Sequence, residues 1–433
     1  MNQVNPVNQL NLTLCLLSIL LTPFAAAGLA LIHQGLGRSR SAAHAMLSTL
    51  CALSVAAIVF VLVGASWAGH AGGAVHSFQA AGAQWSWLGN DALLARSIVL
   101  DGSPGSLILC LQIFTAGLAA IIPLSTGTDR WRLAPICLAT ALFAGLVYPL
   151  FVHWVWGGGW LSQLAANFGI APFEDMGGAA VIQVTGGLMA LSVAWLLGPR
   201  RGKYSDDGMA TAIPGHNIVL VLFGCIIALV GWIGLECATS ILIYAATPQQ
   251  IVGIMINAVL SASAGCLAAV LTTQIRYRKP DASLSANGWI AGLVAGSAAC
   301  SFVSLAAAIL IGAVAGVLTT YMVEIFELRL LVDDPGGAIS VHAGAGIWGL
   351  IAFGIFGTQS NMTLSNHLLA QLIGVATLLG FMLPLIHGVN LLVNRFVPYR
   401  VDRDGDWQGM DIRELGAGAY PEFVIHADEF IPR

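Results

Sequence analysis

Long apolar stretches separated by short polar ones are the feature that most limits how this chain can fold. Of its 433 residues, 57% are hydrophobic and only 9% carry a charge, whereas an average soluble domain is about 25% charged. So few charges cannot cover a water-soluble surface of this size. The sequence therefore predicts an all-α membrane protein whose chain crosses the lipid bilayer many times.

The number of crossings follows from the apolar segments, since a helix needs about 20 apolar residues to cross the hydrocarbon core. Eleven segments qualify. They are, roughly, residues 10–34, 43–68, 104–126, 133–157, 177–199, 216–240, 249–274, 286–302, 304–326, 338–357 and 368–393. The stretch 286–326 is too long for one span, and we place its turn at the small polar patch Ser297–Ser301.

The basic residues sort to one side of this predicted topology. Sixteen of the 17 Lys and Arg residues follow odd-numbered spans, and only Arg96, between spans 2 and 3, lies on the other side. Because cytoplasmic loops are enriched in Lys and Arg, we predict the N-terminus outside and the C-terminus in the cytoplasm. The first span has no basic residue before it, unlike a secretory signal, so we expect it to be retained. The expected location is the cell (inner) membrane.

One phrase occurs twice. D-M-G-G-A-A-V-I-Q runs from Asp175 to Gln183, and D-P-G-G-A-I-S-V-H runs from Asp334 to His342. The first copy opens span 5 and the second opens span 10, so the two copies cross the membrane in opposite directions. This pattern is typical of an inverted repeat, here of spans 1–5 and 6–10, with the transport path at the repeat interface.

The phrase suggests its own chemistry. An Asp before a helix is a natural N-cap, which predicts this role for Asp175 and Asp334. The polar residue eight positions later lies about 12 Å along the helix, inside the membrane. Polar and ionisable residues at that depth usually face a cavity or path. A histidine satisfied by a neighbouring helix is the alternative for His342, but the repeated phrase favours a functional role.

Four stretches carry a family resemblance. They read V-D-D-P-G-G-A-I-S-V-H-A-G-A-G-I-W-G (332–349), F-V-H-W-V-W-G-G-G (151–159), G-W-I-G-L-E-C-A (231–238) and G-M-D-I-R-E-L-G-A-G-A-Y (409–420). In that order they resemble the tenth-helix signature, the end of the fourth helix, the sixth helix and the C-terminal region of the ammonium transporter family, the Amt/Mep/Rh proteins. The resemblance covers nearly the whole chain and is closest to bacterial Amt-like members.

This resemblance implies a homotrimer in membrane lipid, with a separate pore through each eleven-helix subunit. Ammonium is recruited at an outer vestibule and loses its proton, and ammonia then passes a narrow apolar pore that contains two facing histidines. The physics agrees, because a bare cation at the bilayer centre costs several kcal/mol. A tryptophan face in the vestibule attracts a cation by about 1–2 kcal/mol.

Roles carry over from the family residue by residue. Trp156 is expected to be the vestibule aromatic, and Thr239 stands where the family has a vestibule serine. Asp175 is expected to be the structural acid near the recruitment site. His342 is expected to be the second pore histidine, with Trp232 lining the neighbouring part of helix 6. Asp334 is the repeat-related cap.

Several positions depart from the family. Gln183 stands where the first pore histidine is usual, and Gln cannot titrate, so a proton relay between two imidazoles would be interrupted. The outer gate of the family is a pair of phenylalanines. One of these positions is Leu235 here, and we assign the other to Phe114, with an alignment that is uncertain by one residue. Leu111 replaces a nearby vestibule aromatic, so the predicted cage is weaker and the gate looser.

Two further departures leave alternatives open. Glu236 follows Leu235, where Asn is common in the family. Its carboxylate either attracts cations near the outer mouth or belongs to a buried ion pair. His33 replaces a usual tyrosine near the inner end of helix 1. It either lines the cytoplasmic exit or is an ordinary histidine at a helix end.

The resemblance and the departures support different functions. The first hypothesis is an ammonium/ammonia transporter or channel with altered proton coupling. The second is an ammonium sensor or a non-conducting regulatory subunit, and a weaker third is a neutral gas channel. We predict no enzymatic activity, cofactor or metal, because the sequence shows no nucleophile constellation, phosphate loop or metal-ligand spacing. No nucleic-acid partner is expected.

We divide the chain into a transmembrane domain and a tail. The transmembrane domain covers residues 1–395, with repeats at about 10–199 and 216–357 and span 11 at 368–393. The cytoplasmic tail covers residues 396–433, and in the family this region is the docking surface for PII-class nitrogen regulators. Leu415 stands where a histidine is common in that motif.

Overall fold

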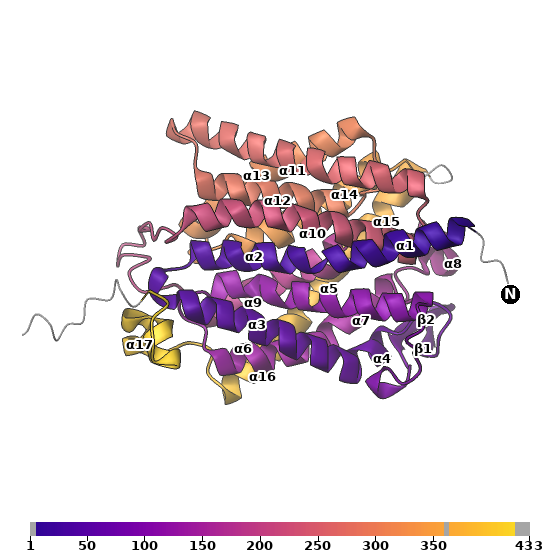
Figure 1. Ribbon diagram of the computed structural model, residues 1–433, viewed down its shortest axis with the longest axis horizontal. Helices are drawn as coiled ribbons and strands as arrows, with labels where there is room; N and C mark the ends of the chain where they lie inside the picture. The colour runs from indigo at the N-terminus through magenta and orange to yellow at the C-terminus, as the bar shows by residue number, and fades with distance from the viewer. Residues whose placement is uncertain (1–5, 359–362, 421–433) are drawn as a thin grey trace, which may run out of the picture.

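The computed structural model describes residues 6–358 and 363–420. Its helices form a bundle in which most of them run along a common direction (Figure 1). The start of α1 (Pro6–Leu21) and a β-hairpin lie at one end of the bundle, and α17 (Arg403–Gln408) lies at the opposite end. Arg433, one of the basic residues that we predicted on the cytoplasmic side, lies outside the described residues.

The described part of the first half contains nine α-helices, and short π- or 3₁₀-helical turns adjoin several of them. After α1 these elements are α2 (Pro23–Leu36), η1 (Ser39–Ser41), α3 (Ala42–Val59), η2 (Phe60–Gly64), α4 (Ala65–Ala68), β1 (Val75–Ala80), β2 (Ala83–Gly89), η3 (Leu93–Ala95), α5 (Pro104–Gly127), α6 (Leu133–Leu142), η4 (Phe143–Val147), α7 (Tyr148–Val155), α8 (Leu164–Phe168), η5 (Ala179–Val184) and α9 (Thr185–Leu197).

The second half of the described chain is again mainly helical. Its elements are α10 (Ile218–Tyr244), α11 (Pro248–Tyr277), α12 (Ala282–Ser297), α13 (Leu305–Leu328), η6 (Ile339–Gly344), α14 (Ala345–Phe356), α15 (Leu364–Thr377), η7 (Leu378–Met382), α16 (Leu383–Phe396), α17 and η8 (Asp411–Leu415).

By length and composition, ten helical segments of the described residues could cross a membrane. They correspond to ten of the predicted spans. The eighth predicted span, 286–302, is the 16-residue helix α12, which is shorter than the other ten segments. The predicted turn at Ser297–Ser301 is confirmed, because α12 ends at Ser297 and α13 begins at Leu305.

The prediction of a purely helical fold missed one hairpin. Strands β1 and β2 pair antiparallel between α4 and α5, with an irregularity in register at His76 and Ser77. The aromatic rings of Trp85 and Trp87 anchor this hairpin to α7 and the loop after it, since their ring centroids lie 5.1 Å from Trp160 and 4.7 Å from Trp154, respectively. The hairpin therefore covers one end of the bundle without crossing it.

The two copies of the repeated phrase have the same local structure. In each, the third residue after the Asp is a glycine with positive φ, 89° at Gly178 and 70° at Gly337. A six-residue π-helical segment follows, η5 in one copy and η6 in the other, and then an α-helix. The helix that follows the first phrase, α9, crosses η6 closely, because a Cβ on Gly187 would lie 2.4 Å from the backbone nitrogen of Ala343. This crossing brings the two polar residues of the phrases together.

Close packing of α2 on α10 fixes two further helices of the site. A Cβ on Gly231 would lie 1.8 Å from the backbone nitrogen of Ala25, and one on Gly28 would lie 2.4 Å from that of Ala228. Glycine at these positions lets the two backbones approach, as small residues do in membrane proteins. This contact places His33 of α2 in the same core as the buried residues of α10, which include Trp232 and Leu235.

Four loops that follow odd-numbered predicted spans meet through buried ion pairs. Arg200, after α9, pairs with Asp333, after α13, at 2.9 Å and with Asp129, after α5, at 3.4 Å. Arg38, after α2, pairs with the same Asp129 at 3.2 Å. These loops therefore lie at one end of the bundle, as the distribution of basic residues predicts.

The tail docks on two helix N-termini at this end. The carboxylate of Asp411 accepts hydrogen bonds from the backbone N–H groups of Ala43 (3.2 Å) and His44 (2.8 Å), at the start of α3. Glu414 accepts from the backbone N–H of Leu133 at 2.7 Å and lies 3.0 Å from Nε2 of His44. Carboxylates are favourable at helix N-termini because they meet free N–H groups.

Acidification is expected to loosen this docked tail. Burial alone would raise the pKa of Glu414, but hydrogen bonds from His44 and Leu133 and the charges of His44 and Arg132 hold this pKa below its ordinary value of 4.5. A carboxyl group with a lowered folded-state pKa stabilises the fold above its unfolded-state pKa. That stabilisation is lost as the pH falls through the lowered value. Cleavage of the tail by an acid-tolerant protease should therefore accelerate as the pH falls below about 4.5.

Glu414→Gln is the matched variant, because it removes the titrating group and keeps an acceptor for Leu133. We expect the variant to be cleaved faster than wild type at neutral pH and to show a weaker dependence on pH. Equal cleavage of the two proteins at every pH would contradict a stabilising role for Glu414.

Candidate functional site

Gln183 and His342 meet where the two copies of the phrase cross. Both side chains are buried, and Nδ1 of His342 lies 2.7 Å from Oε1 of Gln183. With the amide oxygen as its partner, Nδ1 carries the ring proton, which leaves Nε2 of His342 as a hydrogen-bond acceptor. The residues that sequence analysis placed at equivalent positions of the two phrases are therefore bonded to each other.

Two buried polar atoms of this region have no hydrogen-bond partner among the described residues. They are Nε2 of Gln183 and Nδ1 of His33. The side chain of His33 lies in the neighbourhood of the His342 ring. Buried polar atoms in native proteins are nearly always hydrogen-bonded, so each of these two atoms is left able to form one more hydrogen bond.

Asp175 organises the first phrase. Its carboxylate accepts hydrogen bonds from the backbone N–H groups of Gly178 (3.1 Å), Ala180 (2.8 Å) and Val181 (2.8 Å). Its backbone oxygen accepts the indole N–H of Trp156 at 2.9 Å. The carboxylate is thus committed to the start of η5, and the same residue fixes the orientation of the tryptophan ring.

Four predicted residues lie on neighbouring turns of α10. Leu235 and Thr239 are completely buried, and the Thr239 hydroxyl donates within the helix to the backbone oxygen of Leu235 at 2.9 Å or of Glu236 at 3.1 Å. Its lone pairs are left free to accept. Trp232, also buried, donates its indole N–H to Oγ of Ser297 at 2.9 Å.

Glu236 is neither exposed at a mouth nor part of an ion pair. Its side chain is 1% exposed, and none of the ion pairs between described residues includes it. Oε1 accepts the Ser297 hydroxyl at 2.7 Å, whereas Oε2 is buried without a partner among the described residues. The ion-pair alternative is therefore wrong, because no basic side chain of this part of the chain reaches the carboxylate.

The assignment of Phe114 to the gate is corrected by the structure. Phe114 is half-buried and lines a cavity among α2, α3 and α5, beside the exposed Leu50. One residue turns a side chain by about 100° around a helix. Thr115, rather than Phe114, lies on the buried face of α5 with Leu111, and its Oγ1 accepts the Tyr148 hydroxyl at 2.7 Å.

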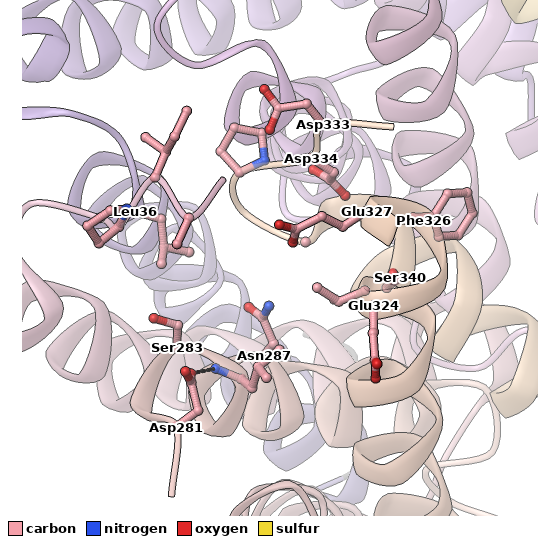
Figure 2. A pocket seen from close by; sticks show the side chains of 18 of the residues that line it. Leu36, Asp281, Ser283, Asn287, Glu324, Phe326, Glu327, Asp333, Asp334 and Ser340 are labelled. Atoms are coloured by element: carbon pink, nitrogen blue, oxygen red, sulfur yellow. Dashed lines mark hydrogen bonds between the residues drawn. The ribbon is translucent and has the colours of Figure 1, made fainter. Parts of the chain in front are cut away.

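A cavity of about 580 Å³ opens among the ends of α2, α10, α12 and α13 and the second phrase (Figure 2). Asn287 and Ser340 line it, and Ser340 precedes His342 by two residues. Asp334 also lines it, but its carboxylate accepts hydrogen bonds from the Thr126 hydroxyl (2.6 Å) and the backbone N–H of Ile339 (2.8 Å). The cavity leads from the end with the basic loops toward the second phrase.

Comparison with known proteins decides the family. The sequence model described as Ammonium Transporter Family matches residues 12–420. The chain belongs to the ammonium transporter family. It is 31% identical to the ammonium transporter Amt2 of Archaeoglobus fulgidus, over 98% of this chain and 91% of the relative. It is 29% identical to the ammonium transporter of Bacillus subtilis, over 94% of this chain and 96% of the relative.

Solved structures agree with this assignment. A protein described as a Sensor Amt Protein superposes with a TM-score of 0.84 at 25% identity, covering 93% of this chain and 98% of the other. Candida albicans Mep2 superposes with a TM-score of 0.80 at 21% identity, covering 97% and 92% of the two chains. The chain is therefore a multi-pass, mostly helical membrane protein of a family that transports ammonium.

Residues that bond to the predicted ones were not all predicted from the sequence of this member of the ammonium transporter family. Ser297 appeared only as the start of a turn, although its hydroxyl joins Trp232 to Glu236. A Cβ on Gly177 of the first phrase would lie 2.9 Å from the backbone oxygen of Ser297, and a Cβ on Gly336 of the second would lie 2.5 Å from Cβ of Ser125. The corresponding glycines of the two phrases, Gly177 and Gly336, therefore each pack against a serine.

Proposed function

We propose that this protein passes ammonia through a pore in each subunit that Gln183, His342 and His33 line. The observation that carries the proposal is the Gln183–His342 hydrogen bond, beside which the buried Nε2 of Gln183 has no partner among the described residues. Ammonia has one lone pair to accept with and three N–H groups to donate. Nε2–H of Gln183 supplies the donor and Nε2 of His342 an acceptor. The apolar surroundings exclude the charged ammonium ion.

Recruitment and deprotonation of ammonium are proposed at an outer vestibule beside Trp156 and Thr239. Ammonium has only donors, so its site needs acceptor atoms and an electron-rich surface. The Trp156 ring, held by Asp175, supplies the surface, and the free lone pairs of the Thr239 hydroxyl supply an acceptor. Leu235 and Leu111 are proposed as an aliphatic gate between this vestibule and the pore. Trp232 packs beside the pore.

Proton coupling is proposed to differ from that of a pore with two histidines. A relay needs a group at each step that binds and releases a proton, and the amide of Gln183 does neither. The bond from His342 to Oε1 of Gln183 also occupies the nitrogen that would face a second imidazole. Because Gln183 interrupts the relay, we expect ammonia to pass with little accompanying charge.

The proposed setting is that of a bacterial Amt-like homotrimer in the inner membrane. Counting α12 as a crossing gives eleven spans, with the N-terminus outside and the C-terminus in the cytoplasm. The matching geometry of the two phrases supports the inverted repeat of spans 1–5 and 6–10. The tail from residue 396 is proposed as a regulatory segment and a docking surface for a PII-class protein. Its residues 421–433 lie outside the described residues.

An ammonium sensor is the second candidate function. Two observations favour it: Gln183 removes the relay, and a structural neighbour is described as a Sensor Amt Protein. A sensor would bind ammonium and hold it, whereas a transporter would release it on the other side. Transport by the purified protein separates the two.

The deciding experiment is ammonia entry into proteoliposomes that contain the purified protein and an internal pH dye. We expect the internal pH to rise faster after addition of an ammonium salt than it does in protein-free vesicles. An unchanged rate would overturn the transport proposal. Ammonium binding to the same sample, measured by calorimetry, would then establish the sensor.

Replacing Trp156 with leucine is expected to weaken recruitment. Loss of a cation–π contact of about 1–2 kcal/mol raises the ammonium concentration for half-maximal transport by about 5- to 30-fold. Trp156→Phe keeps an aromatic face but loses the hydrogen bond to Asp175. Its half-maximal ammonium concentration should therefore lie between those of wild type and Trp156→Leu. An unchanged half-maximal concentration in the leucine variant would exclude Trp156 from recruitment.

A further inference from the structure

The Ser297 hydroxyl has two acceptors for one proton. Its Oγ lies 2.7 Å from Oε1 of Glu236 and 2.9 Å from the backbone oxygen of Leu293. It also accepts the indole N–H of Trp232 at 2.9 Å. A serine hydroxyl has one proton and two lone pairs, so it donates either to Glu236 or to Leu293 at any moment.

These two orientations match the two protonation states of Glu236. When the carboxylate is ionised, the Ser297 hydroxyl donates to Oε1. When Oε1 carries a proton, Glu236 donates to Oγ of Ser297, and the hydroxyl turns to the Leu293 oxygen. The Trp232 bond persists in both states, because Oγ has a lone pair for each donor. The site therefore holds a proton or releases it without breaking its bond to Trp232.

The surroundings of Glu236 favour proton exchange over a fixed charge. A buried carboxylate without a cationic partner is costly, and Oε2 has no partner among the described residues. Among the described residues, the titratable groups beside Glu236 include the thiols of Cys237 and Cys300. The Asp175 carboxylate, which also interacts with Cys300, is committed to backbone N–H groups.

Glu236 lies between the two parts of the proposed path. Gly177, in the loop that Asp175 opens, is so close that a Cβ there would lie 2.9 Å from Cγ of Glu236. On its other side the carboxylate connects through Ser297 to Trp232, beside the proposed pore. Glu236 thus lies between the proposed recruitment site and the proposed pore. Gln183 in that pore cannot accept a proton.

We propose that Glu236 is a proton-binding site of the transport cycle, an inference that rests on the proposed function. One N–H bond of ammonium breaks, and its electron pair stays on nitrogen, which leaves as ammonia through the pore. An O–H bond forms on the Glu236 carboxylate, and Ser297 turns to Leu293. The proton then returns to the water on the outer side, because Gln183 gives it no route inward. One neutral ammonia crosses in each cycle.

The first test is the pH dependence of ammonia entry in the proteoliposome assay, with the full chain and Glu236→Gln. The amide keeps an acceptor for Ser297 but cannot take a proton. At neutral and acidic pH, where ammonium predominates, we expect the variant to be about 100-fold slower, as for loss of a proton acceptor. Above the pKa of ammonium itself the two rates should converge, because free ammonia enters directly. Glu236→Asp should restore part of the rate.

Two results would overturn this proposal. Equal rates of wild type and Glu236→Gln at every pH would show that no proton passes through Glu236. A rate lowered by the same factor at every pH would show a merely structural role. Asp207→Asn, which removes an exposed carboxyl group far from the site in sequence, is the control and should match wild type.

The second test does not depend on transport. Infrared difference spectra between acidic and alkaline pH, without ammonium, report protonated carboxyl groups. We expect a carboxyl band that is absent in Glu236→Gln and present in Asp207→Asn. If wild type transports nothing, the proposed function fails, but this band still shows proton binding at Glu236. Identical spectra of wild type and Glu236→Gln would overturn the proton site even if ammonia transport is found.

Discussion

Replacing Asp175 with alanine is expected to lower the free energy of unfolding by roughly 3 kcal/mol or more and to abolish ammonia transport. The carboxylate accepts three backbone N–H groups at the start of η5, and all of these groups are buried. Alanine leaves them without partners, and each unsatisfied buried donor costs about 1–3 kcal/mol. Relaxation of η5 also moves Gln183, so the pore is lost together with stability.

Thermal unfolding of the purified protein in detergent, together with the vesicle assay, measures both effects. Asp175→Asn is the matched variant, because its single amide oxygen still accepts part of the hydrogen bonding. We expect its unfolding temperature to lie between those of wild type and Asp175→Ala. An alanine variant that unfolds and transports like wild type would contradict the structural role of this carboxylate.

The repeated phrase shows how much of the site can be predicted from sequence. Its two copies predicted that Gln183 and His342 occupy equivalent positions, and the structure joins them by a hydrogen bond. Apolar segments likewise predicted where the helices lie, because the thickness of the membrane sets their length. Both predictions depend on periodicity and spacing, which a single sequence displays directly.

Features that depend on helix rotation and tertiary contact were not predictable in this way. Phe114 and Thr115 are adjacent in sequence, yet only the rotation of α5 decides which one is buried. The surroundings of Glu236 depend on Ser297, which is 61 residues away in the chain. The hairpin β1–β2 lies between two spans, where hydropathy carries no information on strands. A polar side chain in an apolar helix indicates that it has a hydrogen-bond partner, but the sequence does not show which residue that partner is.

Gln183→His is expected to turn a nearly silent pore into a current-carrying one. A histidine at this position places a second imidazole against Nδ1 of His342, 2.7 Å from the present amide oxygen. Imidazole both binds and releases protons near neutral pH, so it restores the step that an amide cannot perform. The proton can then follow ammonia through the pore instead of returning outside. Gln183→Asn, a shorter amide, is the control and should remain silent.

The most direct test of the account is the ammonium-evoked current of purified wild type and Gln183→His on a solid-supported membrane, beside ammonia entry in vesicles from the same preparation. We predict that both proteins accelerate ammonia entry and that only the histidine variant gives an ammonium-evoked transport current. A large ammonium-evoked current in wild type would contradict the claim that Gln183 separates ammonia passage from charge movement.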